Sequence, residues 1–163
     1  MIKTEGKMKG FIFGIIIGAL VGLVGGIYLL PILTAEEGLS ATEISEQLIA
    51  IGTEKREGIF SKDRQGSDAF HWGEGIITVG ADQVVFEGTM APGPDYRLYL
   101  TPQFVETEED FLAIKDASVA VGMVKSYQSF ALPVGDSINP NDYDSVIIWC
   151  EAFNQFITSA KLN

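Results

Sequence analysis

The chain contains a single cysteine, Cys150, whose thiol has the widest chemical repertoire of any side chain in the sequence. A cysteine sulfur serves as a redox group, a nucleophile or a metal ligand only as a thiolate or when a metal binds it. Neither of its neighbours in sequence, Trp149 and Glu151, carries the positive charge that lowers the pKa of a thiol. Three roles stay open: a small apolar core residue, a redox or metal-bound sulfur, and one partner in an intermolecular disulfide.

His71 is the only histidine and the second candidate ligand. Paired with Cys150, Met90 or Met123, it would hold haem iron axially or bind a copper ion. A blue-copper site needs two histidines, and a zinc site with one histidine and one cysteine would need two carboxylates as well. The alternative is a half-exposed histidine that bonds a backbone carbonyl beside a turn. The sequence leaves the cofactor unknown, with haem as the candidate.

The sequence lacks the patterns expected for hydrolytic catalysis, phosphate binding and calcium binding. A nucleophile and base pair made of Cys150 and His71 lacks a visible third orienting residue and an oxyanion loop. The Gly-Pro-Asp turn at 93–95 lacks the glycine spacing and the lysine of a phosphate loop. The acidic run at 106–110 lacks the spaced ligands of a calcium loop, and we expect a solvated loop or the start of a helical turn into 111–114. We therefore expect no enzyme with turnover of its own.

The residues before Cys150 predict the strand that positions its thiol. Positions 146 to 150 form an unbroken apolar run, which is typical of a strand buried on both faces. Because side chains alternate along a strand, Val146, Ile148 and Cys150 share one face. Ile147 and Trp149 share the other face. The thiol is therefore expected to face a packed layer.

From residue 58 onward short apolar runs alternate with clusters of Gly, Pro, Asp and Asn, which is the pattern of strands and turns. We predict strands at 58–61, 75–79, 83–87, 96–101, 118–125, 128–132, 145–150 and 156–162. Eight such runs with no long helix among them favour a mainly β fold, either an antiparallel β-sandwich or a barrel-like sheet. Residues 57–163 are therefore expected to form one outer domain.

A short amphipathic helix is predicted ahead of these strands. Ser40 and Glu43 have the spacing of a capping box, and apolar residues follow at helical spacing. We expect a helix at 41–51, within a neck at 34–56. Its single apolar stripe must be covered, either by the outer domain or by a second copy of the chain.

Residues 10–33 form a run of 24 residues without a charge. As a helix the run would span roughly 36 Å, enough to cross a bilayer core of about 30 Å. Three lysines lie in residues 1–9 and two glutamates follow the run, so the amino-terminal tail is expected in the cytoplasm. A cleaved signal peptide is the rival, but its apolar region is usually about 7 to 15 residues long. We predict an uncleaved signal-anchor with a single span and an extracytoplasmic domain, periplasmic or extracellular.

Five glycines recur at intervals of four within the apolar run and so form one stripe of the predicted helix. They are Gly10, Gly14, Gly18, Gly22 and Gly26. Such a glycine zipper lets a second backbone approach closely, which predicts a homo-oligomer in the membrane. The alternative is that the stripe faces lipid, because glycine is common in membrane helices.

The charge of the chain is lopsided. The first nine residues hold three of the eleven basic residues and one of the twenty-two acidic residues, so the remainder has a formal net charge of −13. This charge disfavours nucleic acid and anionic lipid as partners, since both are negative. It favours a self-repelling soluble domain or one with a basic protein partner.

The order of these signals resembles the DM-thirteen (DM13) domain family, which often accompanies DOMON domains. The matching pieces are Gly58-Ile-Phe60, Asp68-Ala-Phe-His71 with Gly73 and Gly75, Gly93-Pro94-Asp95 leading into Leu98-Tyr-Leu100, Gly122 before 127–133, Ser145 to Cys150 with Phe153, and 156–162. The resemblance covers 57–163 and implies a compact β-sandwich. It also implies electron transfer through the cysteine, as a bare thiol or a haem ligand. The departure is Tyr96-Arg97, where the family pattern has a leucine first.

Two functions follow as hypotheses. The first is a membrane-anchored extracytoplasmic redox module, with Cys150, His71 and Trp149 as redox or cofactor-binding candidates. Asp68 and Asp95 would orient the loops around that site. The second is a non-catalytic binding or scaffolding module of the cell envelope, in which Cys150 and Trp149 are core residues.

Overall fold

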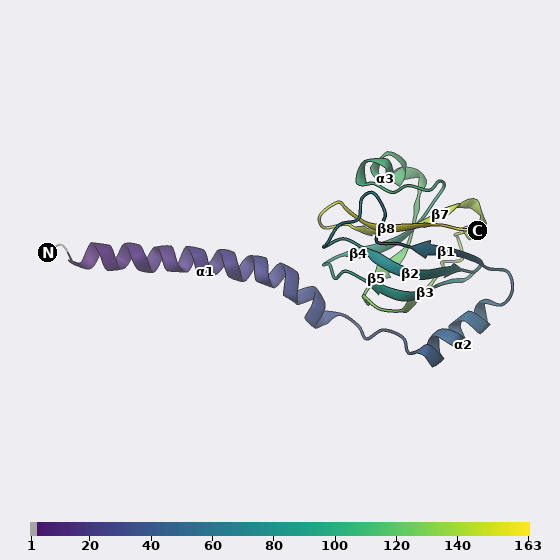
Figure 1. The fold of residues 1–163 in the computed structure, drawn as a ribbon, viewed down its shortest axis with the longest axis horizontal. Coiled ribbons are helices and arrows are strands. Elements are labelled where there is room, and N and C mark those ends of the chain that lie inside the picture. Colours follow the sequence, from purple (N-terminus) through teal and green to yellow (C-terminus); the bar gives the residue numbers. More distant parts are fainter. Residues whose placement is uncertain (1–2) are drawn as a thin grey trace. The chain divides into compact units, whose positions relative to one another are not determined.

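The computed structural model describes residues 3–163 and divides the chain into two compact units, Met1–Thr34 and Ala35–Asn163. The first two residues of the predicted cytoplasmic tail lie outside the described residues. The first unit is helical and the second consists mainly of strands (Figure 1).

The first unit is one helix, α1 (Lys3–Thr34), which includes the predicted span. The segment Met8–Ile27 has a mean hydropathy of 2.4, so this helix is long and apolar enough to cross a membrane. Both a membrane anchor and a signal sequence have this composition. The helix runs three residues past Pro31, because a proline near a helix end removes one backbone hydrogen bond without ending the last turn.

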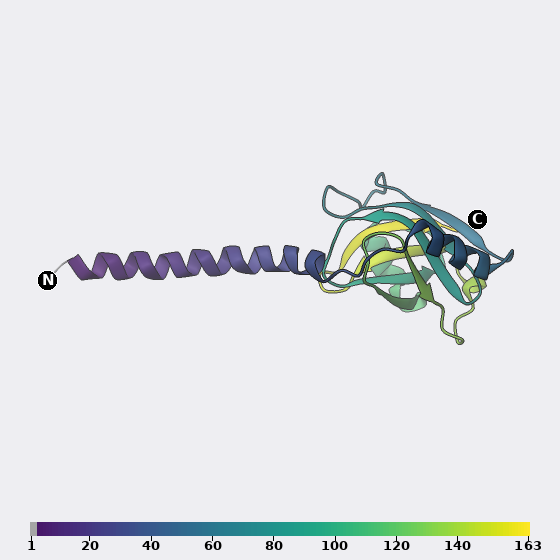
Figure 2. The ribbon, with the colours of Figure 1, turned by 90° about the horizontal axis from the view of Figure 1, so that it is seen from below.

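The second unit is a sandwich of two antiparallel sheets (Figure 2). The first sheet has the order β1 (Arg56–Phe60), β2 (Gly73–Val79), β3 (Gln83–Met90) and β6 (Phe130–Pro133). The second sheet has the order β5 (Val119–Val124), β4 (Tyr96–Thr101), β7 (Ser145–Cys150) and β8 (Gln155–Lys161). The predicted mainly β fold is confirmed, and the eight predicted strands differ from the observed ones by at most three residues at an end.

The central strand of the second sheet, β7, is buried along its whole length. Val146, Ile148 and Cys150 face the core between the two sheets. Ile147 and Trp149 face a second apolar layer on the outside of the sheet. The alternation expected from the sequence is therefore confirmed, and the strand is covered on both faces.

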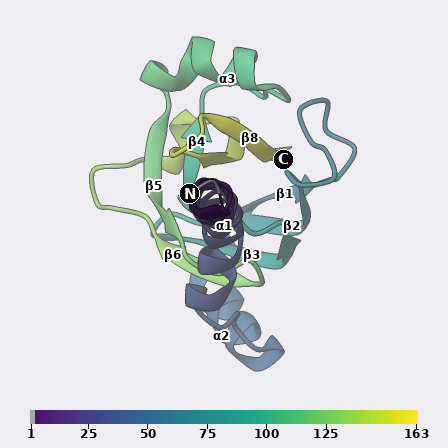
Figure 3. The same cartoon turned by 90° about the vertical axis from the view of Figure 1, so that its left-hand side faces the viewer.

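Two helices of the second unit lie against different sheets (Figure 3). Helix α3 (Glu108–Ile114) covers the outer layer of the second sheet, where the centroids of the Phe111 and Trp149 rings lie 4.8 Å apart. A 3₁₀ turn, η1 (Lys115–Ala117), continues it, and a second 3₁₀ turn, η2 (Pro140–Asp142), precedes β7.

Helix α2 (Ala41–Ile51) has the predicted bounds and the predicted capping box between Ser40 and Glu43. Its Ile44 side chain is buried. The Gln83 side-chain amide donates to the Gln47 carbonyl over 2.8 Å, which joins the helix to β3. The sandwich therefore covers the apolar stripe of this helix.

The two sheets approach a closed barrel where β1 meets β8. The backbones of Glu57 and Asn163 exchange hydrogen bonds of 3.0 and 3.4 Å beside this seam. A Cβ added at Gly58 would lie 2.7 Å from the Lys161 carbonyl and 2.9 Å from the Ala160 Cβ. Only glycine allows this approach of the two edge strands.

The seam can be tested with Gly58→Val. The added side chain must push β1 from β8, so we expect the free energy of unfolding to fall by about 1–3 kcal/mol in urea denaturation followed by circular dichroism. Gly135→Val is the matched control, because a Cβ there meets nothing within 4 Å and should change stability by about 0.5 kcal/mol or less. Equal stabilities of the two variants would contradict the close packing at the seam.

Candidate functional site

The Cys150 side chain ends β7 and lies in the core between the sheets, with 2% of its surface exposed. Tyr96 is its register partner on the neighbouring strand β4. The Tyr96 and Tyr127 rings pack edge to face with their centroids 5.9 Å apart. The Tyr127 hydroxyl donates a hydrogen bond of 2.6 Å to the Gly93 carbonyl. The thiol therefore sits among two tyrosines and the Gly-Pro-Asp turn that the sequence singled out.

Three backbone amides act on the Cys150 thiol. The amides of Phe153, Asp95 and Ala152 favour the thiolate and so act to lower the pKa of the thiol. Burial has the larger and opposite effect, and with the charge of Asp95 it raises the pKa of the Cys150 thiol. We call these three amides the amide nest. At neutral pH the thiol therefore keeps its proton.

Two turns build the amide nest. The Glu151 amide donates to the Asp95 carbonyl over 2.9 Å, which joins the β7–β8 turn to the start of β4. Asn154 has a φ of +49°, a conformation that asparagine tolerates and that reverses the chain after Phe153. The pairing of β7 with β8 also shifts register between Ile148 and Trp149, and such bulges re-aim neighbouring side chains.

On the outer face, Glu151 lies beside an aromatic layer. Its carboxylate accepts hydrogen bonds from the Tyr99 hydroxyl and from the Lys115 ammonium group, the latter over 2.7 Å. Burial and the hydrogen bond to Glu151 raise the pKa of Tyr99 to about 12. No sequence pattern pointed to this cluster, because its members come from β4, from η1 and from the residue after β7.

His71 lies in the loop between β1 and β2. Its ring Nδ1 lies 2.9 Å from one carboxylate oxygen of Asp68. The other carboxylate oxygen accepts hydrogen bonds from the backbone amides of Phe70 and His71. The hydrogen bond with His71 is the largest cause that lowers the pKa of Asp68. The ring is thus bonded to a carboxylate, where the sequence suggested a backbone carbonyl.

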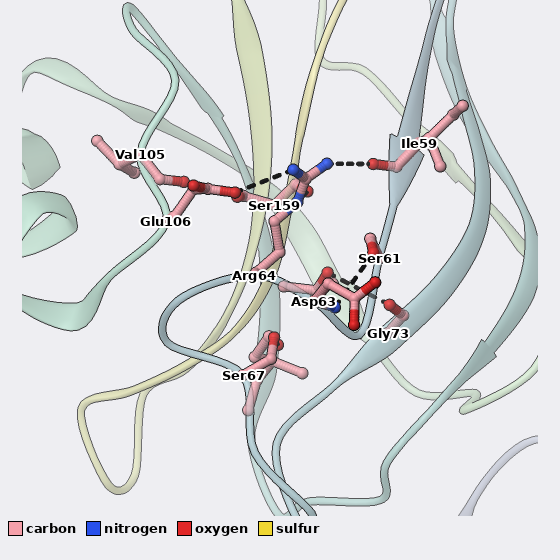
Figure 4. A network of polar contacts seen from close by, with 11 residues as sticks. Ile59, Ser61, Asp63, Arg64, Ser67, Gly73, Val105, Glu106 and Ser159 are labelled. Atoms are coloured by element: carbon pink, nitrogen blue, oxygen red, sulfur yellow. Dashed lines mark hydrogen bonds and ion pairs between the residues drawn. The ribbon is translucent and has the colours of Figure 1, made fainter.

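Arg64 holds the same loop in place (Figure 4). Its guanidinium donates to the Ser159 carbonyl over 2.9 Å, to the Glu106 carboxylate over 2.9 Å and to the Ile59 carbonyl over 2.8 Å. Glu106 is therefore a half-buried ion-pair partner of Arg64. Of the two expectations for the acidic run at 106–110, the start of a helical turn into 111–114 is confirmed. The rest of that run caps and begins α3: the Thr107 side chain accepts a hydrogen bond from the Asp110 amide as the N-cap of the helix.

The described residues contain no group of three or more His, Cys, Asp or Glu side chains that could hold a metal ion. Of the other predicted ligands, Met90 is buried in the core and Met123 is half exposed on β5. Four depressions in the described part of the chain, of about 210, 400, 490 and 540 Å³, are lined by neither Cys150 nor His71. The sulfur lies in packed core, so haem does not fit this arrangement.

Comparison with known proteins agrees with the resemblance noted from the sequence. No curated protein matches the chain, and no solved structure matches it. A family model described as electron transfer DM13 matches residues 60–162, which begin at the last residue of β1 and end after β8. That match spans more than half of the chain, and the chain therefore belongs to the DM13 electron-transfer family.

Proposed function

We propose that the chain is a membrane-anchored, extracytoplasmic redox module whose redox group is the bare Cys150 sulfur. Membership of the electron-transfer family supports a redox role. The observation that carries the assignment to Cys150 is its place in the fold: the single cysteine of the chain ends the central strand β7 opposite Tyr96 and lies just before the exposed turn at 152–154. Electron transfer needs no solvent access, so burial of the sulfur is compatible with this role.

The proposed step transfers one electron and one proton, and it needs only the Cys150 site and one partner protein. The neutral thiol loses one electron to a one-electron acceptor on a partner protein, of the metal or flavin class, and becomes a neutral sulfur radical. Its proton passes by way of the half-exposed Asp95 carboxylate, whose charge acts on the thiol, and is released to solvent. Reduction reverses both transfers. The exposed turn of Ala152, Phe153 and Asn154 offers the partner a contact surface next to the sulfur.

The placement in the envelope is part of the same proposal. Helix α1 supports one membrane span. The three lysines that precede the uncharged run at 10–33 favour a cytoplasmic amino terminus. The domain would then face the periplasm or the exterior. Its net negative charge favours a partner with a basic surface.

A binding or scaffolding module is the second candidate, and the burial of Cys150 among apolar residues favours it. In that case Cys150 is a small core residue and contributes only packing. The two functions differ in whether Cys150 exchanges electrons.

The redox role can be tested by protein-film voltammetry of the full chain in detergent. We expect a one-electron couple whose midpoint falls by about 59 mV per pH unit, because one proton leaves with the electron. The couple should vanish in Cys150→Ala and persist in Val124→Ala, which trims the same core cluster on β5, a strand separated from β7 by β4. A wild type without a couple would favour scaffolding, and a couple that survives in Cys150→Ala would place the redox group elsewhere.

Self-association of α1 can be tested separately with the pair Gly18→Leu and Gly22→Leu. If the stripe lets two backbones approach, leucine at both positions should turn detergent-solubilised oligomers into monomers, as measured by light scattering. The control pair, Ile16→Leu and Val24→Leu, lies on the opposite side of the helix and should leave the oligomer intact. An unchanged mass for the glycine variant would rule out the predicted zipper.

A further inference from the structure

Tyr99 packs in the outer aromatic layer of the second sheet, and a short path connects it to the Cys150 sulfur. The Tyr99 hydroxyl donates a hydrogen bond to the Glu151 carboxylate, and Glu151 follows Cys150 directly in the chain. The path from the sulfur to the phenol oxygen therefore runs through two neighbouring residues and a single hydrogen bond. Glu151 also precedes the exposed turn at 152–154, which is the contact surface proposed for the partner.

The Glu151 carboxylate has the properties of a base for the Tyr99 phenol. A buried tyrosine that loses an electron must lose its proton as well, because a buried positive ring is costly. One oxygen of Glu151 accepts the Tyr99 hydroxyl and the other accepts the Lys115 ammonium group over 2.7 Å. Burial alone would raise the pKa of Glu151, but the hydrogen bonds from Lys115 and Tyr99 outweigh it and lower the pKa. The carboxylate is therefore ionised and able to accept the phenol proton.

Two other rings near Cys150 lack such a base. The Trp149 Nε1 is buried and has no hydrogen-bond partner among the described residues. The Lys115 Nζ lies 5.3 Å from the centroid of the Trp149 ring, so a positive charge on that ring would be repelled. On the inner face the Tyr127 hydroxyl donates to the Gly93 carbonyl, which is too weak a base to hold the proton. Among these three rings of the described chain, the one that has a proton acceptor is Tyr99.

We propose that Tyr99 is a redox relay through which the electron of Cys150 reaches the partner, with the Glu151 carboxylate as the base that takes and returns the phenol proton. This inference rests on the proposed redox role of Cys150 and names the route by which the electron leaves the buried sulfur. The side chains of Glu151 and Lys115 are 22% and 26% exposed, so the relay lies near the surface that the partner contacts.

The relay works in two balanced steps. In the first step Tyr99 gives one electron to the metal or flavin acceptor of the partner and its proton to Glu151, which leaves a neutral tyrosyl radical and a neutral carboxylic acid. In the second step the radical takes one electron from Cys150 and its proton back from Glu151. The thiol proton is released to solvent by way of Asp95. The sum is the loss of one electron and one proton by Cys150, with Tyr99 and Glu151 restored.

Voltammetry of the full chain in detergent tests the relay with Tyr99→Phe. The phenylalanine keeps the ring and removes the hydroxyl that gives up a proton. Because a relay changes the rate of the Cys150 couple and not its free energy, we expect electron exchange to slow by about tenfold or more, with an unchanged midpoint. Tyr143→Phe is the matched control, since Tyr143 packs against the inner core two residues before β7, at the end of that strand opposite Cys150. It should change neither the rate nor the midpoint.

Electron paramagnetic resonance detects the radical itself. After photo-oxidation of the full chain by a ruthenium tris-bipyridine complex with persulfate, the wild type should show a neutral tyrosyl signal that Tyr99→Phe removes and Tyr143→Phe keeps. Glu151→Gln should also remove the signal, because an amide offers the phenol an oxygen acceptor but cannot take its proton. In Cys150→Ala the signal should persist longer, since the thiol that reduces the radical is absent.

The outcomes separate the relay from the proposed function. A Cys150 couple with equal rates in the wild type and Tyr99→Phe would overturn the relay and leave the redox role of Cys150 standing. A tyrosyl signal that survives in Tyr99→Phe would place the radical on another tyrosine and would also overturn the relay. A wild type without a couple would overturn the redox role of Cys150, and the relay with it.

Discussion

The whole outer domain depends on covering both faces of β7. One face closes the core between the two sheets with Ile148 and Cys150, and the other lies under the α3 residue Phe111 through Trp149. A central strand with apolar side chains on both faces is stable only between two layers. The sandwich supplies one layer and α3 supplies the other, so the long loop that carries α3 is part of the fold.

This double burial also decides what the cysteine can do. Because Cys150 points into the inner core, its sulfur has little access to solvent. Glu151, next in the chain, points to the outer layer and meets Tyr99 and Lys115. The alternation of one strand thus connects a buried sulfur to a charged cluster on the other face of the sheet. Family membership gives this arrangement a redox context.

The parts of the structure that follow from local pattern were predictable. The alternating faces of β7, the eight strands and the capping box of Ser40 and Glu43 are each encoded within a few residues. The nest, the Arg64 network and the Glu151 cluster were not, because each joins segments that are far apart in sequence. Asp95 was noticed as a turn residue, but it comes close to the end of β7 only through the pairing of β4 with β7.

The central claim is that the sulfur of Cys150 acts without haem. An ultraviolet–visible spectrum of the full chain, purified from cells supplied with haem and recorded before and after reduction, tests this most directly. The packed core around the sulfur predicts a flat baseline above 300 nm, both in the wild type and in Cys150→Ala. A Soret band that shifts on reduction and disappears in Cys150→Ala would contradict the account and make Cys150 a haem ligand.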